Sequence, residues 1–157
     1  PGLTLMDVRR KVQQARRHDA DLRLVIVDYL QLMEGDADNR NQMLGAIANG
    51  LKRLAKEFGL WIVLLSQLNR EADKRSGPPQ MAELRDSGEI EGAADLIGLL
   101  HREWRRKPNE ENKHWAQLHV AKHKNGPTDT LNLWFDGETQ RFGNWERPAP
   151  RGRMGDG

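Results

Sequence analysis

Two aliphatic runs without polar alternation stand out along the chain. Arg23–Asp28 and Leu60–Leu65 each have the length of a strand. A continuous apolar run of this kind is typical of a strand that is buried on both faces of a parallel sheet. A third strand is expected over Ala94–His101.

Apolar residues recur at helical spacing in two other segments. The first covers residues 5–15, where Thr4 is placed to cap the helix and Asp7 lies in its first turn. The second covers residues 43–58 and is followed by Gly59, a residue that commonly ends a helix. We therefore expect an amphipathic helix before the first strand and a longer one between the two aliphatic runs.

The C-terminal part of the chain has the pattern of a hairpin. Apolar and polar residues alternate over Trp115–Lys122 and over Thr130–Phe135. Asn125–Pro127 lies between these segments and contains the residues that favour a turn. We expect two antiparallel strands joined by this turn.

The order of the expected elements indicates the fold class. Strand, helix, strand, helix, strand and hairpin follow one another, with a loop and a short helix over Glu83–Ala94. This order favours an α/β three-layer domain over residues 1–146, with a mostly parallel sheet and an antiparallel extension. Residues 147–157 are rich in proline, glycine and arginine, which predicts a disordered tail.

The composition of the chain excludes several classes of protein. The chain has 157 residues, 31% of them charged, and no apolar run long enough to span a membrane. It has no cysteine, which excludes disulfides and thiolate metal sites and is compatible with a cytoplasmic protein. Its formal net charge is only +2, so we expect any contact with nucleic acid to be local.

Polar residues follow both aliphatic runs. Asp28 ends the first run and Ser66-Gln67 follows the second. In a parallel sheet these residues share the edge at which α/β proteins bind ligands, and a carboxylate there suits Mg²⁺ on a nucleotide. A turn aspartate and a loop-capping glutamine would explain each residue taken alone. Two further segments, Arg85–Gly88 and Lys122–Gly126, weaken that simpler explanation.

Several motifs together resemble one family. The chain resembles the C-terminal, RecA-like motor domain of the DnaB-type replicative DNA helicases, which are hexameric 5′→3′ helicases of bacteria and their phages. The resemblance extends collinearly over about residues 2–145. The matching segments are Gly2–Thr4, Val27–Met33, Leu51–Glu57, Leu65–Arg70, Leu84–Gly88, Ile90-Glu91, Ala94-Asp95 and Ala121–Thr128.

The resemblance implies roles for individual residues. Asp28 corresponds to the Walker B aspartate, which orders Mg²⁺ and its waters at the ATP phosphates. Gln67 corresponds to the residue that contacts the γ-phosphate and couples it to DNA. Arg85, Asp86 and Gly88 fall on the central-channel loop that grips single-stranded DNA. An arginine and a glycine N–H suit phosphate oxygens, whereas Asp86 is expected to orient Arg85 or to contribute a backbone group.

The two lysines of the last motif correspond to basic residues that reach the ATP site of the neighbouring subunit. Lys122 and Lys124 are therefore expected to bind nucleotide there, and Lys124 joins Asp28 and Gln67 as an expected catalytic residue. The family usually has arginine at the position of Lys124, and lysine lacks the bidentate fork of arginine. The sequence also departs from the family at Gly92-Ala93 and Asp129.

One expected motif is absent. The sequence contains no Gly-x-x-x-x-Gly-Lys-[Ser/Thr] phosphate loop and no counterpart of the catalytic glutamate that follows it in the family. The fold implied is therefore an incomplete RecA-like P-loop NTPase domain. Without the phosphate-loop backbone to hold the β- and γ-phosphates, we predict that this polypeptide alone neither binds ATP tightly nor hydrolyses it. Removing the phosphate-loop strand is also expected to leave a long apolar edge in the sheet or to force non-native strand pairing, which favours aggregation.

The resemblance also implies partners and leaves alternatives open. The parent protein would use ATP and Mg²⁺, form a homo-hexamer, bind single-stranded DNA, and contact a primase and a helicase loader, with no membrane association. One alternative is another RecA-like ATPase, which the Asp-Tyr-Leu-Gln-Leu and Leu-Arg-Asp-Ser-Gly motifs disfavour. Another is a truncated, non-catalytic paralogue that binds helicase subunits. The nucleotide sequence upstream of Pro1 would distinguish a truncated enzyme from such a paralogue.

Overall fold

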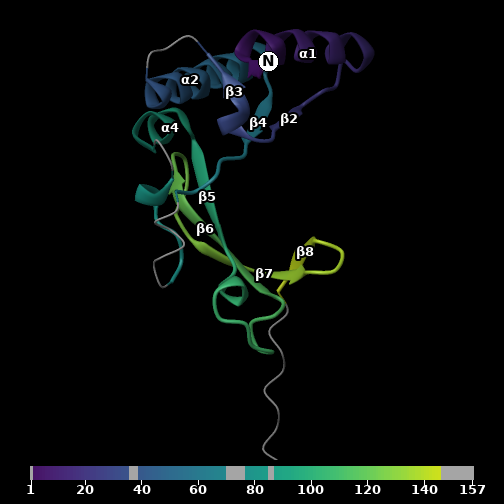
Figure 1. Ribbon diagram of the computed structural model, residues 1–157. Helices are drawn as coiled ribbons and strands as arrows, with labels where there is room; N and C mark the ends of the chain where they lie inside the picture. Colours follow the sequence, from purple (N-terminus) through teal and green to yellow (C-terminus); the bar gives the residue numbers. More distant parts are fainter. Residues whose placement is uncertain (1, 36–38, 70–76, 85–86, 146–157) are drawn as a thin grey trace, which may run out of the picture.

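Helices lie over short parallel strands, and a longer antiparallel sheet extends away from them (Figure 1). The computed structural model describes residues 2–35, 39–69, 77–84 and 87–145. The helices are α1 (Leu5–His18), α2 (Arg40–Phe58) and α4 (Ser87–Ala93), with 3-10 turns η1 (Leu30–Leu32), η2 (Met81–Glu83) and η3 (Glu103–Arg105). The strands are β1 (Leu3–Thr4), β2 (Leu24–Val27), β3 (Met33–Glu34), β4 (Trp61–Leu64), β5 (Leu96–His101), β6 (Trp115–His123), β7 (Thr130–Asp136) and β8 (Arg141–Asn144).

Both long helices begin or end as their sequences predict. The side chain of Thr4 accepts a hydrogen bond from the backbone of Asp7, and the Asp7 carboxylate accepts one from the Thr4 backbone, so α1 starts with a capping box. Gly59 ends α2 in the left-handed conformation, with φ of 59°. A residue with a Cβ is disfavoured in that conformation, which explains the glycine.

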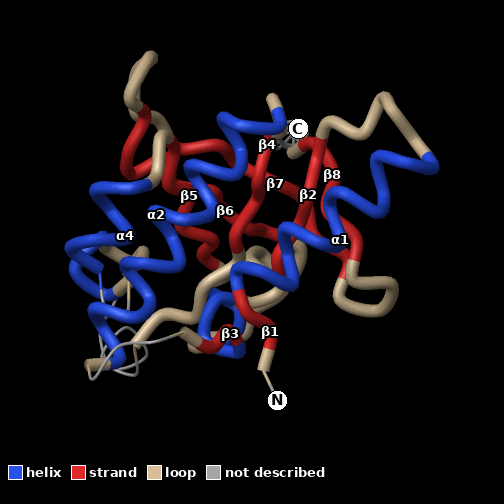
Figure 2. The backbone as a smooth tube through the Cα atoms, turned by 90° about the horizontal axis from the view of Figure 1, so that it is seen from above, coloured by secondary structure: helices blue, strands red, loops and turns tan. Residues whose placement is uncertain are grey.

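The parallel part of the structure is small. Strands β2 and β4 pair in parallel with Leu24 opposite Trp61 and Val27 opposite Leu64, because α2 carries the chain back to the start of the sheet. Strands β1 and β3 form a second parallel pair. In the view from above, the helices lie in front of the strands (Figure 2).

The α/β class is confirmed, but the mostly parallel sheet is not found as predicted among the described residues, because the sheet is split. The described strands form three sheets, and the largest is the antiparallel sheet β5-β6-β7-β8. No ladder joins β4 to β5 among these strands, so the two parts are separate sheets. The hairpin β6–β7 is confirmed, and β8 adds a strand that was not predicted.

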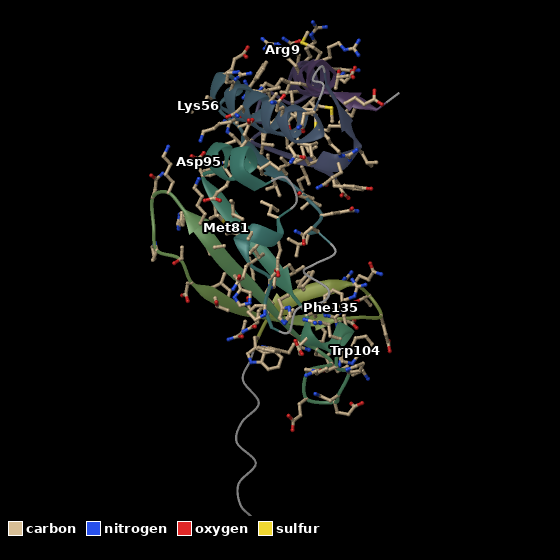
Figure 3. The ribbon with its side chains drawn as sticks, turned by 60° about the vertical axis from the view of Figure 1, so that its left-hand side comes forward. Arg9, Lys56, Met81, Asp95, Trp104 and Phe135 are labelled. Atoms are coloured by element: carbon tan, nitrogen blue, oxygen red, sulfur yellow. The ribbon has the colours of Figure 1, made fainter. Side chains whose placement is uncertain are left out.

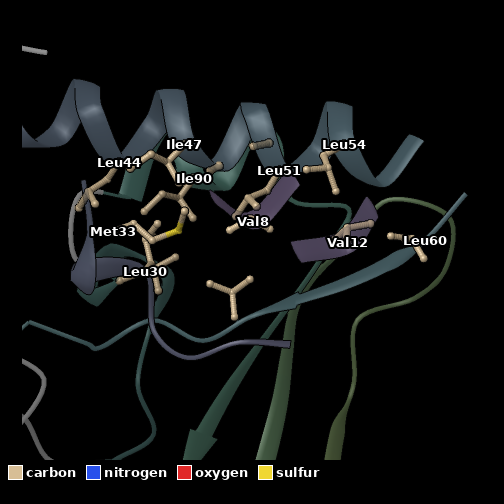
Figure 4. Close-up of a cluster of buried hydrophobic side chains, with 14 residues drawn as sticks. Val8, Val12, Leu30, Met33, Leu44, Ile47, Leu51, Leu54, Leu60 and Ile90 are labelled. Atoms are coloured by element: carbon tan, nitrogen blue, oxygen red, sulfur yellow. The ribbon is translucent and has the colours of Figure 1, made fainter. Parts of the chain in front are cut away.

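The main hydrophobic core lies between the helices and one face of the β2–β4 pair (Figure 4). Leu30 and Leu44 have no exposed surface. The buried members of the core are Val8, Val12, Val27, Leu30, Met33, Leu44, Ile47, Ala48, Leu51, Leu54, Leu60, Leu84, Ile90 and Ala93. Because α1, α2 and α4 all contribute to this cluster, it fixes the helices on the strands that carry the candidate site.

The prediction that both aliphatic runs are buried on both faces is also wrong. Val27 is 5% exposed, but Ile26 is 61% exposed and Trp61 is 78% exposed. The described helices cover one face of the β2–β4 pair, and no described element covers the opposite face. An aliphatic run shows that both faces favour burial, but it does not show what covers each face.

The remaining predictions concern the short helix, the tail and the membrane. The short helix predicted within Glu83–Ala94 is α4. The predicted tail, residues 147–157, lies outside the described residues. No helix in the described part of the chain is long and apolar enough to cross a membrane.

Candidate functional site

Asp28 and Gln67 lie at the same edge of the β2–β4 pair, as the sequence predicts. Val27 and Leu64 are paired at the carboxyl ends of the two strands, and the Leu65 N–H donates to the Val27 carbonyl at 3.0 Å. Asp28 follows directly and is exposed. Among the described residues no hydrogen bond or ion pair occupies its carboxylate. Its oxygens are therefore free to bind a ligand.

Gln31 holds the end of β4 next to the segment that carries Asp28. Its Nε2 donates to the Ser66 hydroxyl at 2.9 Å and lies 3.5 Å from the Gln67 carbonyl, while its Oε1 accepts from the Gln67 N–H at 3.3 Å. The Leu30 N–H donates to the Leu65 carbonyl at 2.9 Å and extends the same ladder. The Gln31 amide thus fixes the Gln67 backbone and leaves the exposed Gln67 side chain free.

Sequence reasoning missed Gln31 as a site residue. The available signal was its place three positions after Asp28, in a segment that the family resemblance already marked. Its side-chain partners are 35 and 36 positions away in the sequence, so only the fold reveals them.

The segment after Gln67 is joined to the segment that precedes the predicted DNA loop. Leu68 and Leu84 form an antiparallel bridge, and the Asn69 N–H donates to the Glu83 carbonyl at 2.8 Å. Arg85 and Asp86, two of the three predicted DNA-binding residues, lie outside the described residues. Gly88, the third, is exposed in α4 and has open space where a Cβ would be. The bridge therefore ties the strand end at Gln67 to the base of this loop.

The two predicted nucleotide-binding lysines lie at the end of β6, near α4. The Lys122 ammonium donates to the Glu91 carbonyl. The Lys124 ammonium lies 3.9 Å from Asp95 Oδ1, and the Lys124 N–H donates to the Asp95 carbonyl at 2.8 Å. Within the described part of the chain, their polar contacts are with Glu91 and Asp95, not with Asp28 or Gln67. The structure thus brings Asp28 and Gln67 together and holds the lysines elsewhere.

Asp95 is the acidic group beside these lysines. Its Oδ1 accepts a hydrogen bond from Lys52 of α2 at 2.9 Å. This bond is the main reason that the pKa of the Asp95 carboxyl lies below its usual value; burial opposes the shift, and the charges of Lys52 and Lys124 add to it. Lys52 also donates to the Ala93 carbonyl at 2.8 Å. Asp95 therefore stays ionised over the whole neutral range.

The metal chemistry available at this edge is limited. The described residues contain no group of three or more His, Cys, Asp or Glu side chains that could hold a metal ion. Mg²⁺ bound to a nucleotide needs only one or two protein carboxylates, because phosphates and waters complete its octahedral shell. The free, exposed carboxylate of Asp28 fits that requirement, and it does not fit a metal held by the protein alone.

The comparisons with known proteins agree on one family. The model of the DnaB-like helicase C terminal domain matches residues 1–144. The replicative DNA helicase DnaB of Haemophilus influenzae is 41% identical over 146 residues, which are 91% of this chain and 31% of the relative. The DnaB of Geobacillus stearothermophilus is 35% identical over 94% of this chain and 33% of its own length. The chain thus spans about a third of the length of these relatives.

Solved structures give the same result for the fold. A DnaB-like replicative helicase, described with its interactions with primase, superposes with a TM-score of 0.86 at 34% identity, covering 92% of this chain and 36% of the helicase. A second solved structure, an ATPase domain, also gives a TM-score of 0.86 at 34% identity, and 52% of its chain is covered. The chain therefore belongs to the DnaB-like helicase C-terminal domain family.

Proposed function

We propose that this chain is the part of a replicative DNA helicase motor that couples ATP hydrolysis to 5′→3′ movement along single-stranded DNA. The observation that carries the proposal is the shared edge of β2 and β4, where Asp28 and Gln67 follow the paired strand ends. A RecA-like three-layer fold is our proposal for the intact motor domain.

Asp28 is proposed to hold Mg²⁺ through water at the ATP phosphates. Bound Mg²⁺ would neutralise charge on the β- and γ-phosphates during phosphoryl transfer. The support is chemical, since the carboxylate is exposed and has no competing partner among the described residues. Gln67 is proposed to contact the γ-phosphate, with its backbone held in place by Gln31.

The path from nucleotide to DNA is proposed to run through Leu68 and Leu84. A shift of Gln67 would move this bridge and therefore the start of the DNA loop. In that loop the Arg85 guanidinium and the Gly88 N–H would bind phosphate oxygens, and Asp86 would orient Arg85 or present a backbone group. Contacts of this kind do not read bases, as a motor that moves along any sequence requires.

Lys122 and Lys124 are proposed to act at the ATP site of a neighbouring subunit in a homo-hexamer. Within the described part of the chain their polar contacts are with Glu91 and Asp95 rather than with Asp28 or Gln67, which supports a role in another subunit's site. There the Lys124 ammonium would stabilise charge that develops on the transferred phosphoryl group. A primase is a proposed partner, because one similar helicase was described with its interactions with primase. A helicase loader is proposed from the family resemblance alone.

A chimera tests this proposal. Residues 1–144 would replace the matching segment of the Haemophilus influenzae helicase, so that the phosphate loop comes from the relative. We expect the chimera to hydrolyse ATP, and Asp28→Asn to lower kcat by on the order of 100-fold or more, since metal-held charge is worth several kcal/mol in the transition state. Hexamer formation, measured by size-exclusion chromatography, should be unchanged.

The contrary outcome is also specific. A chimera that assembles but has no ATPase activity would contradict the proposal and favour the non-catalytic paralogue. An active chimera in which Asp28→Asn has no effect would remove Asp28 from the site. Asp21→Asn is a matched control, because Asp21 is an exposed aspartate in the loop before β2, where it pairs with the exposed Arg23.

A further inference from the structure

Asp95 lies at the junction of the helices and the antiparallel sheet. It sits between the end of α4 at Ala93 and the start of β5 at Leu96. Figure 3 shows Asp95 below Lys56 of α2, at the level where the helices meet the sheet. Its side chain is 60% exposed, so it is not a core residue.

The Asp95 carboxylate is fixed from the helix side. Lys52, whose side chain is only 22% exposed, donates to Asp95 Oδ1 at 2.9 Å. The same ammonium donates to the Ala93 carbonyl at 2.8 Å, at the end of α4. Lys52 therefore joins α2, α4 and Asp95, and it holds the negative charge in one place.

The same residue is fixed from the hairpin side by its backbone. The Asp95 carbonyl accepts from the Lys124 N–H at 2.8 Å, immediately after the last ladder pair, Leu96 with His123. Asp95 Oδ1 lies 3.9 Å from the Lys124 ammonium, at the outer limit of an ion pair. The attraction between two exposed charges at this distance is weak. The carboxylate therefore orients the ammonium without preventing it from moving to a phosphate.

From this geometry we propose that Asp95 is a positioning residue for Lys124. Its carbonyl fixes the backbone of Lys124, and its carboxylate directs the Lys124 ammonium. Lys52 of α2 holds the Asp95 carboxylate in place. The inference rests on the proposed role of Lys124 at a neighbouring subunit's ATP site. Stabilising a developing charge depends on the donor's position, so a misplaced cation costs kcat rather than ATP binding.

The test is a double-mutant cycle in the chimera that carries residues 1–144. Lys124→Met should lower kcat by about 1000-fold, the lower range for removal of a cation supplied in trans. Asp95→Asn should lower kcat by about 10-fold, with KM for ATP within about twofold, as removal of a supporting residue usually does. The double variant should be no slower than Lys124→Met, because Asp95 acts through Lys124.

Further variants separate positioning from a general structural role. Asp95→Glu keeps the charge and should recover part of the kcat that Asp95→Asn loses. Lys52→Gln keeps a donor for the Ala93 carbonyl but removes the charge that holds Asp95, so it should reproduce a smaller loss. This variant also tests the inference if Asp95→Asn does not assemble. Asp21→Asn, which breaks an exposed pair with Arg23, should have no effect.

Two results overturn the inference and leave the proposed function intact. One is an unchanged or higher kcat for Asp95→Asn while Lys124→Met is slow. The other is a loss from Asp95→Asn that is equally large with and without Lys124. If Lys124→Met itself is as active as the chimera, the proposed role of Lys124 fails, and the role of Asp95 fails with it.

Discussion

The two faces of the β2–β4 pair consist of the same kinds of residue but have different surroundings. Val27 points toward the helices and is 5% exposed, whereas its neighbour Ile26 points the other way and is 61% exposed. Successive side chains of a strand point to opposite faces, so one covering layer protects only every second residue. The covered face also buries Leu30, which lies beside Gln31 in η1. The covered face therefore anchors the segment that carries Gln31, and through it the candidate site.

The largest expected effect tests the core of the covered face. Leu44 of α2 has no exposed surface and belongs to the buried cluster. We expect Leu44→Ala to lower the free energy of unfolding by about 2–5 kcal/mol, because it leaves a cavity between α2 and its neighbours. Urea unfolding followed by circular dichroism measures this loss. Leu44→Met is the control and should cost less than about 1.5 kcal/mol, since it roughly conserves volume.

A matched pair on β2 compares the two faces directly. Val27→Ala should lower the free energy of unfolding by about 1.6 kcal/mol, for two buried carbon groups at about 0.8 kcal/mol each. Ile26→Ala removes more carbon, but from an exposed side chain, and should change it by about 0.5 kcal/mol or less. The same urea measurement applies to both variants. Equal losses would contradict the difference between the faces.

Local elements of the fold were predictable because their signals lie in neighbouring residues. Thr4 and Asp7 are three positions apart, and together they start α1. Gly59 ends α2 because glycine readily adopts the left-handed backbone conformation. The hairpin β6–β7 required only alternation and a turn. These features need no knowledge of the rest of the chain.

The sheet arrangement and part of the site could not be predicted in the same way. Whether β4 pairs with β5 depends on residues that are distant in sequence, and the aliphatic character of both strands fits one sheet or two. The shared position of Asp28 and Gln67 at one edge could be predicted, because both follow strands that pair in parallel. Gln31 and Asp95 act through partners that are far away in the sequence, so nothing in their local sequence shows what they hold.

The next prediction concerns the start of α1, one of the helices on the covered face. Thr4→Ala should lower the free energy of unfolding by about 1 kcal/mol, the usual cost of an N-cap. Urea unfolding at pH 7 measures it. Thr4→Ser keeps the hydroxyl and should retain most of the stability. An unchanged value for Thr4→Ala would show that the capping box contributes nothing to the fold.

The same cap has a defined pH dependence. Hydrogen bonds from Thr4, followed by Arg10, lower the pKa of Asp7 from 3.8 to about 2. Because the pKa of Asp7 is lowered in the folded protein, the stability that its carboxylate contributes is fully present above about pH 4. It is lost as the pH falls toward about 2. The difference between the protein and Thr4→Ala should therefore shrink across this range. A difference that stays constant from about pH 6 to pH 2 would exclude Asp7 as its source.

The smallest change in stability is expected on the face of β2 and β4 that the described helices leave uncovered. Trp61 is 78% exposed, so Trp61→Gln should change the free energy of unfolding by no more than about 0.5 kcal/mol. Its effect should instead be on self-association, because Trp61, Leu24, Ile26 and Val63 form an exposed apolar surface that favours contact between molecules. Sedimentation velocity over a range of protein concentrations should show less association for Trp61→Gln. Phe142→Gln, at an exposed aromatic of β8, is the control.

The contrary outcome concerns stability. If Trp61→Gln lowered the free energy of unfolding as much as Val27→Ala, the face that carries Trp61 would have to be covered in solution. The distinction between the two faces of the β2–β4 pair would then no longer hold.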